Sequence, residues 1–457
     1  MIDFAIDWKD APGVRDPVLA RTWCALTIRI GGVPVTRVFD RRTKGWRNSV
    51  YGSVFPLCRW IVDTLWFLLY EPYRLPIPYG SRDLARNNAD RPWVHRHSLL
   101  AAREGGALPD LTLFRDGDAV LARWLRDGGD TSHPSLRFVQ EGQMRLSPDA
   151  LRDSVEAFVH TVLQRVADLP HADIAQLRDD WRDLCSLTPE ETKLCAWSAR
   201  LGINAHYDDE LSDNAAEGLK AMIDRLEVRI VEDLLDASAL DTIQEDLEWI
   251  DDAHRRARTA RRASTDDWPL HHPRHGQRGE GGATAYAAGY RDARALRTRA
   301  GIGTGVLPDM SGLLRRLGWA DAPLLATDTK PSAYLRAVVD HGHDDVPVLA
   351  AHPPADKTSK RFLLARSLFL QATSGSTERR LVTSSHTWDQ RASRAFAAEL
   401  LAPADALRDR IHSDSVSDRE VAQYADEFIV DPALIERQLE NHAVAQVDNG
   451  RQDLRQW

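Results

Sequence analysis

Short apolar runs near the start of the chain predict strands that are joined by tight turns. Residues 23–30 read Trp-Cys-Ala-Leu-Thr-Ile-Arg-Ile, and a glycine pair separates them from a second apolar run over residues 33–39. This pattern is typical of a β-hairpin. Three hairpins are predicted in this way, and they turn at Gly31-Gly32, at Asp116-Gly117-Asp118 and at Glu141-Gly142.

Apolar residues at helical spacing predict a series of helices after these strands. Residues 55–69 are apolar enough to form a buried helix, and residues 148–166 carry one apolar stripe. A further helix is expected to begin at Thr188, because Pro189 suits the first helical position and Glu191 can reach back to complete a capping box.

The helical pattern disappears between residues 259 and 282, where Pro, Gly, His and Arg dominate. Such a composition is typical of a linker. We therefore expect a mostly helical α+β protein of several domains. Its predicted parts are a mixed N-terminal domain of helices and β-hairpins (1–170), a helical middle domain (171–258), the linker (259–282), a C-terminal domain of a small sheet plus helices (283–445) and a tail (446–457).

The composition is that of a folded protein without an export or membrane segment. Hydrophobic residues make up 43% of the 457 residues and charged residues 28%. The most apolar window, residues 51–70, is interrupted by Arg59 and Asp63, so it has no uncharged run near the roughly 20 residues of a membrane span. The N-terminus lacks a signal-peptide pattern, and the four cysteines show no CxxC spacing. We expect a cytoplasmic protein with reduced thiols and no membrane partner.

Three sequence blocks of the C-terminal domain carry the most informative pattern. A predicted strand pair, residues 335–339 and 346–350, precedes them. Residues 361–370 then read Arg-Phe-Leu-Leu-Ala-Arg-Ser-Leu-Phe-Leu, and residues 390–403 read Gln-Arg-Ala-Ser-Arg-Ala-Phe-Ala-Ala-Glu-Leu-Leu-Ala-Pro. Residues 421–439 predict a closing pair of helices.

In this order the blocks resemble the ImmA/IrrE family of zinc metallopeptidases. In that family a strand pair precedes a helix reading Arg-Phe-x-x-Ala-His-Glu-Leu-Gly-His, and a later helix reads Glu-x-x-Ala-Asn-x-Phe-Ala-Ala-x-Leu-Leu-x-Pro. The resemblance implies a metallopeptidase-like fold for the C-terminal domain. It also implies a bacterial stress, mobile-element or phage-defence setting, since family members cleave or sense regulators such as phage repressors and antitoxins.

The residues at the family's zinc-site positions have changed. By the resemblance, Arg366 replaces the first His, Ser367 the catalytic Glu, Leu370 the second His and Gln390 the third ligand. Zinc hydrolysis needs those ligands and a carboxylate base. A guanidinium cannot coordinate a metal, leucine has no donor atom, and serine does not replace the base. We therefore expect a pseudo-peptidase with no zinc and no other cofactor.

A domain without hydrolytic chemistry is expected to act by contact with a protein partner. The old substrate groove is the predicted surface, and a bulky Phe369 in place of the family's Gly suggests that packing has filled part of it. The predicted groove residues are Arg366, Ser367, Phe369, Gln390 and Arg394. The sequence does not indicate an oligomeric state.

One alternative is a peptidase or other hydrolase that uses displaced metal ligands. The residues that could serve are His341, His343, His386 and Asp389. His341 and His343 lie between two predicted strands, where His, Gly and Asp are ordinary turn residues, so a solvated turn is favoured over a metal site.

A second alternative is a DNA-associated regulator. A basic stretch could contact phosphates, and it comprises Arg255, Arg256, Arg258, Arg261 and Arg262. Acidic residues between 245 and 252 nearly neutralise it, so a solvated helix end is favoured. The net charge of −9 also argues against wholesale binding to nucleic acid, although a local basic patch is compatible with it.

Overall fold

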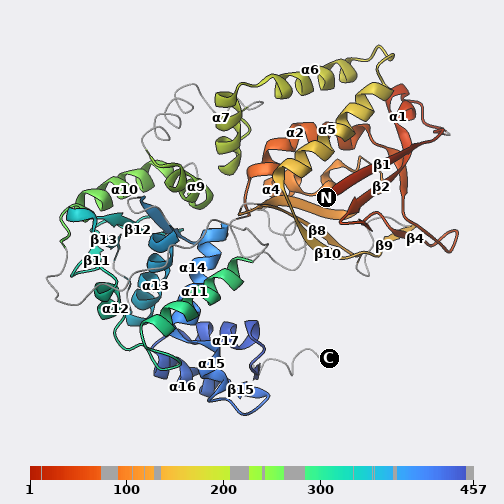
Figure 1. Ribbon diagram of the computed structural model, residues 1–457. Helices are drawn as coiled ribbons and strands as arrows, with labels where there is room; N and C mark the ends of the chain where they lie inside the picture. The colour runs from red at the N-terminus through yellow and green to blue at the C-terminus, as the bar shows by residue number, and fades with distance from the viewer. Residues whose placement is uncertain are drawn as a thin grey trace. The chain divides into compact units, whose positions relative to one another are not determined.

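The computed structural model divides the chain into two compact units, Met1–Met222 and Ile223–Trp457, which are described separately (Figure 1). The structure describes residues 1–448 except for residues 12, 74–90, 105, 118, 128–134, 206–225, 239–241, 262–283, 333, 353, 355 and 374–377. Most of the predicted linker, together with Arg262, therefore lies outside the described residues. Both units combine helices with small sheets, which confirms an α+β protein of more than one unit.

The first unit begins with an antiparallel sheet. Its strands are β1 (Ile2–Trp8), β2 (Trp23–Ile30), β3 (Val33–Pro34) and β6 (Val50–Ser53). The predicted glycine turn is confirmed, because Ile30 pairs with Val33 across it. Gly31 and Gly32 adopt φ values of 57° and 84°, which residues with a side chain rarely adopt.

Two three-stranded sheets complete the strands of this unit. One has the order β5-β4-β9 and the other β10-β8-β7. Their strands are β4 (Val38–Asp40), β5 (Gly45–Arg47), β7 (Asp110–Asp116), β8 (Ala119–Leu125), β9 (Leu136–Phe138) and β10 (Gly142–Leu146). The hairpin predicted between β7 and β8 is confirmed. The hairpin predicted at Glu141-Gly142 is wrong, because β9 pairs with β4 while β10 pairs with β8.

The helices of the first unit surround α2 (Phe55–Tyr70), the buried helix that the sequence predicted. Twelve of its sixteen residues are buried, and it packs against β7 and several neighbouring helices. The capping box predicted at Thr188 is present, because Thr188 accepts from the Glu191 amide and Glu191 accepts from the Thr188 amide. The other helices are α1 (Pro17–Arg21), α4 (Arg91–His97), α5 (Pro148–Arg165), α6 (Ala172–Ser186) and α7 (Pro189–Arg200).

The second unit is built on a four-stranded sheet of order β11-β13-β12-β14. Its strands are β11 (Leu324–Ala326), β12 (Leu335–His341), β13 (Pro347–Ala351) and β14 (Arg380–Thr383). The predicted strand pair is confirmed, because β12 and β13 are antiparallel with Val339 opposite Leu349. β14 is antiparallel to β12, and β11 is parallel to β13.

Helices α13 and α14 of the second unit carry the sequence blocks described above. Gly289 of α11 allows α11 to cross α14 closely, since a Cβ there would lie 2.3 Å from the Ala392 carbonyl oxygen. The helices are α9 (Val228–Ala237), α10 (Ile243–Ala257), α11 (Ala285–Arg299), α12 (Met310–Arg316), α13 (Lys357–Thr373), α14 (Trp388–Leu401), α15 (Ala404–Arg408), α16 (Asp418–Phe428) and α17 (Pro432–Asn441).

Two predicted parts of the chain are organised differently in the structure. The expected helical middle domain is divided, because α6 and α7 pack into the core of the first unit while α9 and α10 belong to the second. The start of the expected tail is a strand, β16 (Gln446–Asp448), which pairs in parallel with β15 (Ser415–Ser417). In the described part of the chain, no helix has the length and apolarity needed to cross a membrane.

Candidate functional site

The structure brings together two of the four residues at the predicted zinc-site positions. Arg366 of α13 donates a hydrogen bond from Nη2 to Oε1 of Gln390 in α14, over 2.7 Å. The same nitrogen donates to the Thr383 carbonyl oxygen at 2.8 Å, and Nε donates to Oγ of Ser393 at 3.2 Å. Arg366 is 5% exposed and Gln390 is fully buried. A guanidinium therefore links the two helices at this point.

Gln390 is held in one orientation by its own hydrogen bonds. Its Oε1 also accepts from the Thr383 amide at 3.0 Å. Its Nε2 donates to the Leu381 carbonyl oxygen at 2.7 Å and to Oδ1 of Asp233 at 3.2 Å. Because an oxygen must face the Arg366 and Thr383 donors, the network itself fixes which end of the amide is which.

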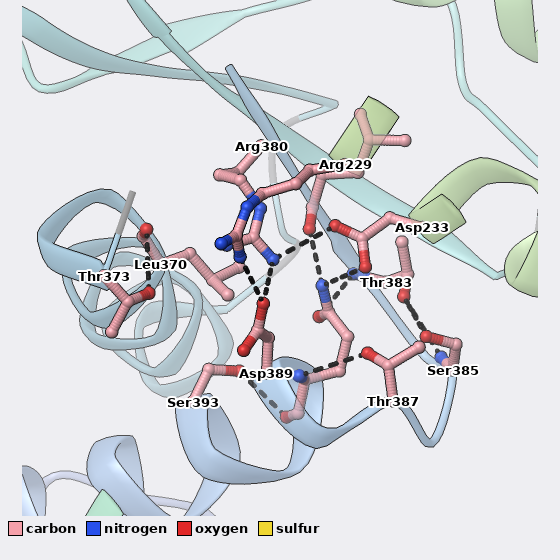
Figure 2. Close-up of polar contacts among 12 residues, drawn as sticks. Arg229, Asp233, Leu370, Thr373, Arg380, Thr383, Ser385, Thr387, Asp389 and Ser393 are labelled. Carbon is pink, nitrogen blue, oxygen red and sulfur yellow. Dashed lines mark hydrogen bonds and ion pairs between the residues drawn. The ribbon is translucent and has the colours of Figure 1, made fainter. Parts of the chain in front are cut away.

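Asp233, which accepts from Gln390, belongs to a group of charged side chains. Figure 2 shows Asp233 beside Arg380, Arg229 and Asp389. Arg380, at the start of β14, donates to Oδ2 of Asp389 at 2.8 Å and to Oδ2 of Asp233 at 3.4 Å. Arg229 of α9 pairs with Asp389 at 3.1 Å. Burial raises the pKa of Asp233 to about 6, although Arg380 acts in the opposite direction. Two carboxylates thus share the charge of one buried arginine.

The electrostatics around Arg366 are those of a buried cation beside other cations. Burial lowers the pKa of the Arg366 guanidinium well below its ordinary value. The charges of Arg394 and Arg336 lower this pKa further, while Asp233 raises it. A divalent metal ion brought to this position would meet the repulsion of these arginines in a medium of low dielectric.

The remaining motif residues are packed into the core. Ser367 is fully buried, and its Oγ donates to the Leu363 carbonyl oxygen one turn earlier at 2.8 Å. Leu370 and Phe369 are also fully buried. The Phe369 ring lies 5.4 Å from that of Phe396 in α14. These side chains therefore act as core residues between the two helices.

Most of the residues predicted to line a partner groove are buried in the structure. Four of its five predicted residues are buried, namely Arg366, Ser367, Phe369 and Gln390. The fifth, Arg394, is half-buried and donates to the Ser385 carbonyl oxygen at 2.7 Å. Burial lowers the pKa of Arg394 to about 10. A partner could reach these side chains only after a rearrangement.

Helix α9 supplies the contact that the sequence analysis missed. Its apolar side chains Ile230, Val231, Leu234 and Leu235 are buried, and it packs against β14. Asp233 and Asp236 lie among them and are buried as well. Carboxylates are rarely buried without a partner. The two carboxylates on this otherwise apolar helix face were therefore the sequence signal that could have indicated a buried polar contact.

The alternative metal ligands do not form a ligand set in the structure. His341 ends β12, His343 begins the short 3₁₀ turn that follows, and His386 precedes α14. Asp389 is committed to Arg380 and Arg229. Among the described side chains, no three His, Cys, Asp or Glu residues lie close enough together to hold one metal ion.

The predicted basic stretch is the C-terminal end of α10 and the residues after it. Arg255, Arg258 and Arg261 are exposed, and Arg255 pairs with Asp252 at 3.1 Å. Arg256 pairs with Asp252 and Asp328, whose hydrogen bonds raise its pKa. Acidic neighbours therefore neutralise part of this stretch, as the sequence pattern suggested.

Arg361, the first residue of the first block, ties three backbone segments together. Its three guanidinium nitrogens donate to the backbone carbonyl oxygens of Ile429, Pro308 and Leu307, at 3.2, 3.0 and 2.5 Å. It thereby ties the start of α13 to the turn between α16 and α17 and to the segment before α12. This is a structural role.

Glu399 has a comparable structural role in the second block. It is fully buried and accepts from Arg294 of α11 at 2.7 Å. It also accepts from Gln438 of α17 at 3.0 Å and from the Ala404 amide at 3.2 Å. The first and second blocks therefore each contain a residue that joins helices.

No protein-family model, curated protein or solved structure matches this chain. The relation to the ImmA/IrrE family stays a prediction from the sequence blocks.

Proposed function

We propose that the second unit carries a metallopeptidase-like domain of the ImmA/IrrE type that has exchanged its zinc chemistry for a structural cluster. The protein then acts as a protein-binding scaffold, sensor or regulator in a bacterial stress, mobile-element or phage-defence response. The observation that carries this proposal is the hydrogen bond between Arg366 and Gln390, the positions equivalent to the first and third zinc ligands. A guanidinium bonded to the third position occupies the place that a metal ion would need, and its nitrogens cannot coordinate the ion.

The packing around this bond supports the same proposal. The position equivalent to the catalytic Glu is Ser367, whose hydroxyl is spent on its own helix. The position equivalent to the second His is Leu370, which is fully buried and offers no donor atom. Arg361 and Glu399 meanwhile make bonds that hold the helices together. A role in binding requires contacts that hold the domain together, but it does not require the ligands and base of a hydrolase.

Metal analysis of protein purified without chelators tests the loss of zinc chemistry. We expect substoichiometric zinc and no zinc-dependent cleavage of casein or of host proteins. One tightly held zinc per chain would overturn the proposal.

Restoring the motif tests the resemblance itself. Ser367→Glu or Leu370→His alone should give no zinc-dependent cleavage, because at least two ligands are still absent. The combined variant Arg366→His, Ser367→Glu, Leu370→His and Gln390→Glu should bind zinc or cobalt if the two helices present the family geometry. A folded combined variant that binds neither metal would contradict the metallopeptidase-like assignment, and cleavage by either single variant would contradict the pseudo-peptidase assignment.

The binding role is tested by purification of the tagged full chain from its native host. We expect a protein that stays associated with the chain in stoichiometric amount through gel filtration. Cross-linking identifies the surface of this chain that contacts the partner. A variant of the chain with that surface substituted should no longer co-purify with the partner. A chain that purifies alone at native expression levels, under all the stress conditions tried, would contradict a scaffold or regulator.

A further inference from the structure

An exposed face of the first unit combines aromatic rings with cations. It lies on the sheet β5-β4-β9. Trp46 of β5 is directly opposite Phe39 of β4, and Phe39 is directly opposite Arg137 of β9. Neighbouring strands are about 4.8 Å apart, so the three side chains form one row across the sheet. Trp46 is 60% exposed, which is unusual for a ring of its size.

The turn beside this row concentrates positive charge. Residues 37–47 hold five basic residues and one acidic residue, in a chain whose net charge is −9. Arg37 lies over the Trp46 ring, with its guanidinium carbon 5.5 Å from the ring centroid. We call the following set the hairpin face: Arg37, Phe39, Arg41, Arg42, Lys44, Trp46 and Arg137.

The single carboxylate of this segment is turned inward. Asp40 is buried, its Oδ1 accepts from the Arg42 amide at 2.9 Å, and its Oδ2 pairs with Arg47 at 3.2 Å. Within the described part of the chain, the side chains of Arg41, Arg42 and Lys44 are exposed and make no ion pair. The cations of the hairpin face are therefore available to an external anion.

From these observations we propose that the hairpin face binds single-stranded nucleic acid. The exposed Trp46 ring, with the half-buried Phe39 beside it, gives unpaired bases a surface on which to stack, and the flanking cations follow the phosphate backbone. A duplex would keep its bases out of reach of Trp46, so the row of rings favours an unpaired strand. An acidic peptide would use the cations but would gain little from Trp46 and Phe39.

The test uses the full-length chain and fluorescently labelled oligo(dT) and oligo(U) strands of about 16 nucleotides, the upper site size of a single-strand binding fold. We expect both, or one of them, to bind with an affinity that falls as salt rises. Trp46→Ala should weaken binding roughly 5- to 100-fold and leave the salt slope unchanged. Arg42→Ala with Lys44→Ala should lower the salt slope by about 0.7 for each lost phosphate contact.

Two matched variants control for general effects. Tyr286→Ala removes another exposed ring, and Arg29→Ala removes an exposed arginine that pairs with Asp3 in the same unit. Both should bind like the unaltered protein. Because Trp46, Arg42 and Lys44 are exposed, their variants should unfold at the same temperature as the unaltered chain.

Several results would overturn the proposal. These are no oligonucleotide binding at low salt, equal affinity for duplex and single strand, or a Trp46→Ala variant that binds as the unaltered chain does. Tighter binding of a poly-glutamate peptide than of either oligonucleotide would make an acidic protein segment the occupant instead.

Discussion

Each unit of the protein holds a buried carboxylate that pairs with an arginine, and the two carboxylates have different surroundings. In the first unit, Glu71 lies between Arg96 and His97. Arg96 donates to both of its oxygens, one of them at 2.8 Å, and Nε2 of His97 lies 3.0 Å from Oε2. In the second unit, Asp233 and Asp389 share Arg380.

The His97 ring lies between two hydrogen-bond acceptors. Its Nδ1 lies 2.7 Å from the Leu113 carbonyl oxygen, which can only accept a hydrogen bond. Its Nε2 faces the Glu71 carboxylate, which also accepts only. Glu71 therefore has Arg96 and His97 as its hydrogen-bonding neighbours.

The pKa values of the two carboxyl groups move in opposite directions, although both groups are buried. Burial alone would raise the pKa of Glu71, but the hydrogen bonds and charges of His97 and Arg96 lower it below its ordinary value. Burial raises the pKa of Asp233 to about 6, and the neighbouring Asp389 raises it too. The number of cations that each carboxylate has to itself decides the direction, rather than the depth of burial.

Removal of the arginine that Asp233 and Asp389 share should have the largest effect. Arg380→Met leaves Asp233 and Asp389 in the core without their common cation. We expect the free energy of unfolding to fall by about 3–5 kcal/mol, the usual cost of leaving one side of a buried ion pair. Urea unfolding at neutral pH measures it. Arg315→Met is the control, because its ion pairs are long and exposed. Equal stability of the two variants would show that Arg380 does not stabilise these two carboxylates.

Much of this architecture could be predicted from the sequence where the signal is local. The buried helix at residues 55–69 and the capping box at Thr188 depend on neighbours within one or two turns, and both are confirmed. Neither feature needs knowledge of distant parts of the chain. The proximity of Arg366 and Gln390 was implied instead by the family resemblance, which places both residues at zinc-ligand positions.

Features that depend on distant pairing escaped the sequence analysis. The run at 136–139 reads as one arm of a hairpin, yet its partner is β4, about a hundred residues earlier. Asp233 lies more than 150 residues from Gln390, and nothing near it in the sequence names that partner. The hairpin face was missed for the same reason, because Trp46, Phe39 and Arg137 form a row only after three strands pair.

The pH dependence of stability should distinguish Asp233 from Glu71 next. Asp233 keeps its proton up to about pH 6 in the folded chain, whereas the unfolded chain loses it near pH 4. The folded state binds more protons in this window, so the contribution of Asp233 to stability falls as pH rises through it. Asp233→Asn cannot ionise and should lack this fall. Relative to the unaltered chain it should gain about 3 kcal/mol between pH 4 and pH 7.

Urea unfolding at several pH values measures this difference, and Asp405→Asn is its control. Asp405 is exposed and pairs with Arg408 one turn later. Its variant should follow the unaltered profile. Parallel profiles for Asp233→Asn and the unaltered chain would mean that Asp233 is ionised in the core, as Glu71 is, and the contrast between the two carboxyl groups would disappear.

The smallest effect is expected from Glu71→Gln in the first unit, because Arg96 and His97 each have another favourable contact. Glu71→Gln keeps an oxygen that can accept from Arg96 or His97, but it removes the negative charge between them. Arg96 is partly exposed and lies over the Phe67 ring, so water and the ring can stabilise it. His97 keeps its contact with the Leu113 carbonyl oxygen. We expect the free energy of unfolding to fall by about 1.5–3 kcal/mol, the range for a hydrogen bond to a charged group.

The control is Glu141→Gln, which breaks an exposed pair with Arg126 and should cost much less. The loss should also shrink as pH falls through the pKa of Glu71, because the unaltered chain then loses the same charge. A loss that stays constant down to that pH would show that shape, and not charge, makes Glu71 important.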